Sequence, residues 1–289
     1  MLRFLVVVAL GIGLGLAAVA VLARILEPRL AFFPLRGEQA TPRDYGVPFE
    51  AVEVRTADGE RLRAWWIDHP SPLAEVLYLH GNGGNLAVWT DILLDVHRQR
   101  FALFALDYRG YGLSSGRPSE QGLYRDVEAA VASFRERAGR RGVPVIYWGR
   151  SLGAVMAARA ARARPPDGLI LESGFPDVAS LLAGSPLAFL ARVTSYRFAA
   201  AEWVQGFEGP VLVLHGDRDS VIPYEQGRRL FARLPRPDRS RFVTIAGGDH
   251  NDPVPRDPQT YWAAVGDLVA AARRTADGSA PSPDQRDRR

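Results

Sequence analysis

Six short, nearly uninterrupted apolar runs recur along the middle of the chain. They are EVLYLH (75–80), FALFALDYRG (101–110), PVIYWG (144–149), GLILES (168–173), PVLVLHG (210–216) and RFVTIAGG (241–248). Strands that are apolar at nearly every position are buried on both faces, as happens in a parallel sheet covered by helices. This repetition predicts an α/β fold.

The segments between the apolar runs have apolar residues at helical spacing. The predicted helices are 125–137, 152–162, 224–234 and 259–273. Before the first run, residues 49–70 alternate apolar and polar residues on either side of Ala57-Asp58-Gly59, which is the pattern of a β-hairpin. We expect a hairpin followed by six strand–helix units in one large domain. Residues 175–207 are too long for a simple connection, so we expect a short helical excursion over the sheet edge.

Both ends of the chain differ from this pattern. Residues 4–23 are uncharged and apolar, lie between Arg3 and Arg24, and are long enough to span a bilayer as a helix. A cleavable signal peptide is the alternative, because Ala18-Val-Ala20 resembles a cleavage site. The sequence continues beyond Arg24 without a polar cleavage region, which favours an uncleaved anchor that places the protein in a membrane. The predicted division is an anchor at 1–27, a folded domain at 28–275 and a disordered polar tail at 276–289.

Composition narrows the function classes. The net charge is +4, but the arginines are scattered and form no stripe with interleaved aromatic residues, so we expect no nucleic-acid partner. The chain has no cysteine, which excludes disulfides, thiolate metal sites and cysteine nucleophiles. We expect neither a cofactor nor a metal. The side of the membrane and the oligomeric state stay open.

Two segments match the Gly-x-Ser-x-Gly pattern of a nucleophile elbow, one around Ser151 and one around Ser114. Ser151 directly follows a predicted strand and directly precedes a predicted helix, which is the context that an elbow needs. Ser114 follows a loop, and Pro118 separates it from the next helix, for which Ser119 is a suitable N-cap. We therefore predict Ser151 as the nucleophile.

A serine nucleophile needs a base and an acid that orients the base. His250 lies in the glycine-rich loop after the last predicted strand, where the histidine of a Ser–Asp–His order belongs. The loop after the preceding strand, HGDRDSVIP, offers Asp217 and Asp219. Asp217 follows a glycine at once and suits a role in pinning the turn, whereas Asp219 lies further out.

The loop HGNGGN (80–85) follows the first central strand and suits an oxyanion hole. The backbone N–H groups of Asn82 and Leu152 would be the donors. Phosphate binding is the alternative for this loop, but the sequence lacks the lysine and Ser/Thr of a P-loop and does not fit G-x-G-x-x-G.

With these segments in this order, the sequence resembles the α/β-hydrolases over about residues 48–273. The block DYRGYGLSSGRPSEQGLYRD is the most specific, and it is similar to membrane-anchored α/β-hydrolase-domain proteins and serine aminopeptidase-like hydrolases. The resemblance implies a triad of Ser151, Asp219 and His250, oxyanion donors at Asn82 and Leu152, and little or no cap domain.

The resemblance leaves the substrate open. We expect a membrane-anchored serine hydrolase that cleaves a small-molecule or acylated ester or thioester. A peptidase of the same mechanism is an alternative, with Glu172 as a possible partner for a peptide amine or as a member of a buried ion pair. A non-catalytic membrane adaptor is another. Tyr108, Arg109 and Tyr111 are candidates for lining the pocket or for packing within their own loop.

Overall fold

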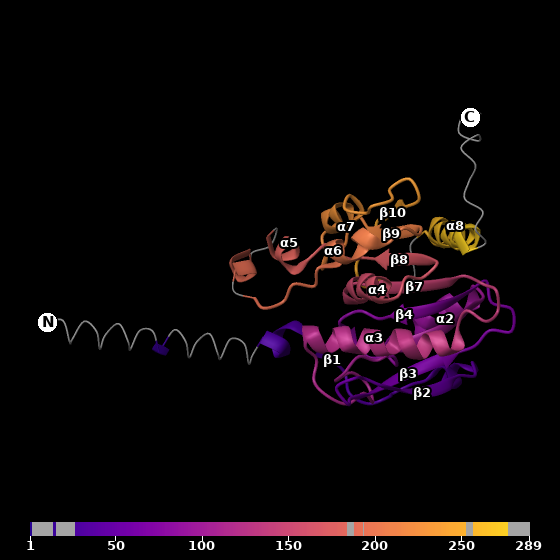
Figure 1. Ribbon diagram of the computed structural model, residues 1–289, viewed down its shortest axis with the longest axis horizontal. Helices are drawn as coiled ribbons and strands as arrows, with labels where there is room; N and C mark the ends of the chain where they lie inside the picture. The colour runs from indigo at the N-terminus through magenta and orange to yellow at the C-terminus, as the bar shows by residue number, and fades with distance from the viewer. Residues whose placement is uncertain (2–13, 16–26, 184–187, 193, 253–256, 277–289) are drawn as a thin grey trace.

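The computed structural model describes residues 1, 14–15, 27–183, 188–192, 194–252 and 257–276, and a single large sheet organises them (Figure 1). The sheet has eight strands in the order β10-β9-β8-β7-β4-β6-β3-β2. These strands are β2 (Glu50–Arg55), β3 (Arg61–Ile67), β4 (Ala74–Leu79), β6 (Phe101–Leu106), β7 (Val145–Arg150), β8 (Gly168–Glu172), β9 (Val211–Gly216) and β10 (Arg241–Ile245).

The pairing of the strands confirms the predicted sheet. Each of the six apolar runs contains one strand, and the five pairs that these strands form are parallel. β2 and β3 form the predicted antiparallel hairpin, and β3 joins it to β6. The sheet is therefore mostly parallel, with one antiparallel edge.

Helices cover both faces of the sheet, as the continuous apolar runs require. The helices are α2 (Thr90–Arg98), α3 (Glu120–Arg137), α4 (Leu152–Ala163), α5 (Val178–Ala183), α6 (Ala200–Trp203), α7 (Tyr224–Phe231) and α8 (Pro258–Ala276), with 3-10 turns η1 (Pro42–Tyr45), η2 (Ala188–Arg192) and η3 (Val204–Gly206). The core on one face includes residues of α3, α4 and α7, and the core on the other includes residues of α2 and α8. Figure 1 shows α3 and α4 next to each other in front of the sheet.

The residues of a single strand divide between these two cores. Val211 and Val213 of β9 pack on the α4 face, whereas Leu212 and Leu214 pack on the α8 face. Such alternation follows from the two-residue repeat of a strand.

The four predicted helices all form. α3 begins five residues before the periodic run 125–137. Ser119 is its N-cap, as predicted, and its hydroxyl accepts a hydrogen bond from the amide of Gly122 (3.1 Å).

Short helices occupy the excursion predicted at 175–207. They are α5, η2, α6 and η3, and α6 packs against α4. At the chain ends, the predicted anchor (residues 4–23) lies outside the described residues apart from Leu14 and Gly15, and so does the predicted tail apart from Ala276. In the part of the chain that the structure describes, no helix combines the length and the apolar character needed to cross a membrane.

A segment that the sequence did not reveal runs along the carboxyl-terminal edge of the sheet; it is helical at residues 27–31 and extended after them. We call residues 27–37 the N-terminal strap. Its strand β1 (Phe33–Pro34) pairs in parallel with β5 (Gly83–Gly84), which lies in the HGNGGN loop. The strap therefore brings the start of the folded domain to the loop that was predicted to form an oxyanion hole.

Two glycines allow α4 to approach the sheet closely. A methyl group on Gly153 would lie 1.8 Å from the carbonyl oxygen of Leu79 in β4. A methyl group on Gly149 would lie 1.8 Å from the carbonyl oxygen of Gly153. Since both of these neighbours are backbone atoms, a larger side chain would push α4 away from the strands.

We therefore predict that Gly153→Ala lowers the free energy of unfolding by about 3 kcal/mol or more, because the added methyl overlaps the backbone. Gly266 of α8 is a matched control, because it is an exposed helical glycine with open space around its Cα. Gly266→Ala should instead leave stability unchanged or raise it by up to about 1 kcal/mol. Urea unfolding of both variants measures the difference, and equal effects would contradict the close-packing argument.

Candidate active site

Ser151 occupies the sharp turn between β7 and α4. It follows the last residue of β7, Arg150, and precedes the first residue of α4, Leu152. Its backbone has φ 57° and ψ −120°. A non-glycine residue at positive φ is strained, and such strain persists only where the surroundings impose it. Here the close packing of α4 on β4 and β7 imposes it, so the serine stands at the tip of the turn.

A chain of hydrogen bonds joins Ser151, His250 and Asp219. Nδ1 of His250 lies 2.8 Å from Oδ2 of Asp219, and Nε2 lies 3.0 Å from Oγ of Ser151. Because a carboxylate only accepts hydrogen bonds, Nδ1 carries the proton and Nε2 is free to accept the serine hydroxyl. This is the tautomer in which an imidazole can remove the proton of the serine. The structure thus brings together the three residues that the sequence predicted as a triad.

The Asp219 carboxylate is held on both oxygens. Oδ1 accepts the amides of Val221 (3.0 Å) and Ile222 (2.7 Å), and Oδ2 lies 3.4 Å from Nε2 of the buried His215. Burial alone raises the pKa of the Asp219 carboxyl, but the hydrogen bonds from His215, His250 and the Ile222 amide outweigh it. The pKa therefore lies well below its ordinary value, and the carboxylate stays ionised beside the imidazole.

Asp217 lies in the same loop, but its side chain binds a backbone amide and not the imidazole. Its Oδ1 accepts the amide of Gly247 at 2.6 Å, so it ties the loop after β9 to the loop that carries His250. The structure places Asp219, and not Asp217, against the imidazole, in line with the expectation for the two aspartates.

The HGNGGN loop lies directly beside the serine. A methyl group on Gly81 would be 3.4 Å from Cβ of Ser151. The side chain of Asn82 points elsewhere, because its Nδ2 donates to the carbonyl of Ala31 (2.7 Å) and its Oδ1 accepts the hydroxyl of Tyr111 (2.9 Å). Only its backbone can therefore serve a bound substrate. Leu152 is the first residue of α4, so its amide has no acceptor within the helix.

Other candidates from the sequence have structural partners. The buried hydroxyl of Ser114 donates to the carbonyl of Asp107 (2.7 Å) and accepts the amide of Arg63 (2.8 Å). Tyr108 donates to the carbonyl of His80, and Arg109 pairs with Asp58 and Asp126. The hydroxyl of Tyr111 donates to the carbonyl of Asn82. These three side chains thus bind neighbouring segments and not their own loop, and the two tyrosines support the HGNGGN loop.

Arg150 is a site residue that the sequence analysis missed. Its guanidinium is buried and donates to the carbonyls of His250 (2.7 Å) and Asp252 (3.0 Å). Its Nε lies 3.6 Å from Glu172, which neighbours it across β7 and β8. One cation therefore ties the loop of the base to the strand that carries the nucleophile. The sequence does contain a signal for this role, because Arg150 is a charged residue at the end of an apolar strand, where a buried charge requires a partner.

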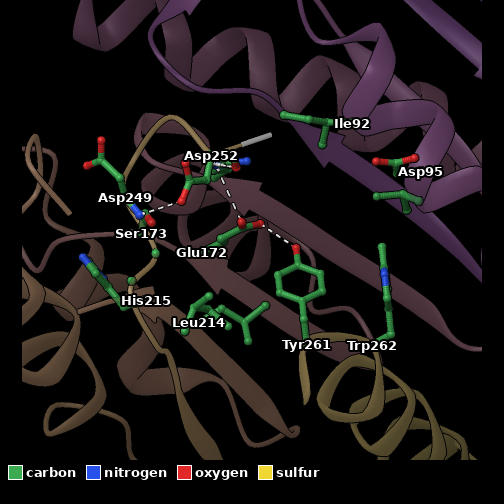
Figure 2. A pocket seen from close by; sticks show the side chains of 15 residues that line it. Ile92, Asp95, Glu172, Ser173, Leu214, His215, Asp249, Asp252, Tyr261 and Trp262 are labelled. Atoms are coloured by element: carbon green, nitrogen blue, oxygen red, sulfur yellow. Dashed lines mark hydrogen bonds and ion pairs between the residues drawn. The ribbon is translucent and has the colours of Figure 1, made fainter. Parts of the chain in front are cut away.

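A small cavity lies behind the His250 loop and is bordered by Arg150, Glu172, Asp252 and Tyr261 (Figure 2). The hydroxyl of Tyr261 points at Glu172 and donates to it (3.0 Å). The cavity volume is about 40 Å³, which suits a few ordered waters and not an acyl substrate. Among the described residues, no three His, Asp or Glu side chains are grouped to hold a metal ion.

Comparisons with known proteins identify the family of the chain. The family model described as serine aminopeptidase, S33, matches residues 70–203. The human α/β-hydrolase domain-containing protein 17B is 34% identical over 208 residues, which are 70% of this chain and 69% of that protein. The chain belongs to the α/β-hydrolase superfamily. An uncharacterized protein of Mycobacterium tuberculosis is 33% identical over 242 residues, 83% of this chain and 85% of the relative.

Solved structures show the same fold. An esterase of Pyrococcus furiosus superposes with a TM-score of 0.67 at 19% identity, over 83% of this chain and 97% of that one. The predicted α/β-hydrolase fold is thereby confirmed, including its mostly parallel sheet.

For this α/β-hydrolase, we predict that Asp219→Asn lowers kcat by about three to four orders of magnitude, because an amide cannot fix the required tautomer or balance the imidazolium. The matched change Asp217→Asn weakens only a loop contact. It should lower stability by about 1 kcal/mol and leave turnover nearly unchanged. Steady-state kinetics at pH 7 with a short aryl ester compares the two, and a larger loss in the Asp217 variant would reverse the assignment.

We also predict that Arg150→Gln lowers kcat by roughly tenfold or more with little change in KM, because the His250 loop loses its clamp and the base is misplaced. Arg135→Gln is the matched control. Arg135 also donates to a carbonyl, that of Pro165 (2.7 Å), but outside the site. If both variants lost stability alike and neither lost turnover, Arg150 would have no positioning role.

Proposed function

We propose that this protein is a membrane-anchored serine hydrolase that cleaves an ester or thioester through an acyl-enzyme. The observation that carries the proposal is the hydrogen-bonded series from Oγ of Ser151 through His250 to Asp219, with the imidazole in the tautomer of a general base. A non-catalytic adaptor would not need this hydrogen-bonded series of three side chains.

In the proposed reaction, Oγ of Ser151 attacks the acyl carbon while Nε2 of His250 takes the hydroxyl proton. The backbone amides of Asn82 and Leu152 would stabilise the negative charge that develops on the carbonyl oxygen. The imidazolium then donates its proton to the leaving alcohol or thiol. His250 next takes a proton from water, whose oxygen attacks the acyl carbon. The imidazolium then returns that proton to Oγ of Ser151 as the bond between Oγ and the acyl carbon breaks, and the acid leaves. Asp219 stays ionised throughout.

A peptidase of the same mechanism is supported by the description of the matching family model. It would need a carboxylate free to bind a peptide amine. Glu172 is poorly suited to this role, because Trp148 (3.3 Å) and Tyr261 (3.0 Å) donate to it and Arg150 lies beside it. We therefore favour esters and thioesters, and membrane anchoring through residues 4–23 belongs to the same proposal.

The test is Ser151→Ala. It should abolish labelling by a fluorophosphonate probe and lower ester turnover by about five to six orders of magnitude, because the nucleophile is lost. Ser114→Ala changes the other Gly-x-Ser-x-Gly segment. The folded Ser114→Ala protein should keep both probe labelling and ester turnover. Comparing p-nitrophenyl esters with aminoacyl amides on the wild type separates the esterase from the peptidase. Wild-type protein that neither labels nor turns over any of these substrates would favour the adaptor.

A further inference from the structure

Exposed apolar side chains gather on the N-terminal strap and beside it. We call this group the rim patch, and its members are Leu30, Phe33, Leu35, Val88 and Leu113. They are between 43% and 75% exposed and are five of the eleven large apolar side chains that are exposed among the described residues. Single exposed apolar residues are ordinary on a protein surface, but a cluster marks an interaction surface.

Contacts along the backbone hold the patch together. The amide of Leu35 donates to Gly84 (2.9 Å), and its carbonyl accepts the amide of Gly112 (2.9 Å), which places Leu113 next to the strap. Val88 packs over Gly84, where an added methyl would lie 2.9 Å from its Cβ. The strap thus fills the gap between the HGNGGN loop and the loop of Leu113.

The strap is also fixed to the excursion at 175–207. Phe32 is buried against Tyr196 and Phe198, with ring centroids 5.6 and 6.3 Å apart. The carboxylate of Glu27 accepts the amide of Ser195 (2.8 Å) and the hydroxyl of Thr194 (2.6 Å). Figure 1 shows β1 and α5 at the same end of the molecule, opposite α8. The patch is therefore a fixed part of the active-site end, since Asn82 donates to Ala31 of the strap.

The short length of chain between the apolar run and the strap indicates which surface covers the rim patch. The apolar run ends at Ala23 and the strap begins at Glu27, so three residues separate them. Even fully extended, three residues span only about 10 Å. Arg29 is exposed beside the patch and suits an anionic lipid phosphate. Arg36 is exposed too, but its guanidinium donates to the carbonyls of Ser114 (2.6 Å) and Gly116 (2.8 Å) and so holds the strap to the loop of Leu113. A chain anchored through residues 4–23 would therefore hold the patch at the lipid surface.

We propose that the rim patch docks on the bilayer that holds the anchor, so that the oxyanion loop opens at the lipid–water interface. The docking rests on the proposed anchor. Docking would give the proposed hydrolase a source of substrate, because acyl chains could reach the site from the lipid phase.

The absence of cysteine makes a direct test simple, because any introduced cysteine is the only thiol of the full chain. The variants are Leu113→Cys in the patch and Leu73→Cys as the matched control. Leu73 is also an exposed leucine (37%), but it directly precedes β4 and so lies at the opposite edge of the sheet. Each is labelled with nitrobenzoxadiazole and reconstituted in vesicles of phosphatidylcholine with a minority of phosphatidylglycerol.

Spin-labelled lipids should quench the label at position 113 several-fold more strongly than the label at position 73. Equal quenching, or a full chain that does not bind vesicles, would overturn the proposal. Disulfide formation between two copies through position 113, without lipid quenching, would assign the patch to a dimer and overturn it too.

A kinetic measurement separates docking from catalysis. Leu113→Ser should lower the turnover of a long-chain ester held in vesicles several-fold and leave the turnover of a short soluble ester unchanged. Leu73→Ser should change neither rate. Equal losses on both esters would contradict the docking role. If the wild type hydrolysed neither ester while position 113 was still quenched, the proposed function would fail and the docking would stand.

Discussion

The close contact of α4 with β4 and β7 is the constraint on which the active-site end depends. Backbone atoms meet backbone atoms there, because Gly149 and Gly153 have no side chains. The turn between β7 and α4 has no room to relax, so Ser151 is held at φ 57°. The same contact sets the first turn of α4 beneath the serine, where its amides and the helix dipole favour negative charge. The fold thus supplies a strained serine and an electropositive site from one packing requirement.

Buried charges then fix His250, the candidate base. Asp219 accepts hydrogen bonds from two amides and from His250, and Arg150 holds the carbonyls of His250 and Asp252. Isolated charges at such depth would cost several kcal/mol each, so each needs partners on more than one side. Asp219 reaches the imidazole from the loop after β9, and Arg150 reaches the backbone of the His250 loop from the end of β7. The position of the imidazole is therefore set by contacts from two strand ends as well as by its own loop.

The sequence predicted those features that leave a local pattern. The six strands follow from apolar runs, and Ser151 was separated from Ser114 because only Ser151 stands between a strand and a helix. Features that arise from long-range contact were not predictable. The pairing of β1 with β5 involves two residues on each side, which is too short for any periodicity. The role of Arg150 depends on a loop a hundred residues away. Its place at the end of an apolar strand indicates a buried partner, but not which partner.

The strap shows why such contacts matter for function. Asn82 has its side chain bound to Ala31 and its backbone carbonyl bound to the hydroxyl of Tyr111 (2.9 Å). The two bonds hold Asn82 by its side chain and by the peptide that follows it, and its own N–H is the candidate oxyanion donor. A donor must already point at the developing charge to stabilise it. One of the two bonds comes from the strap, which directly follows the predicted anchor. The segment that would tie the domain to a membrane therefore also helps to hold the candidate oxyanion donor, so attachment and catalysis would depend on a single structural element.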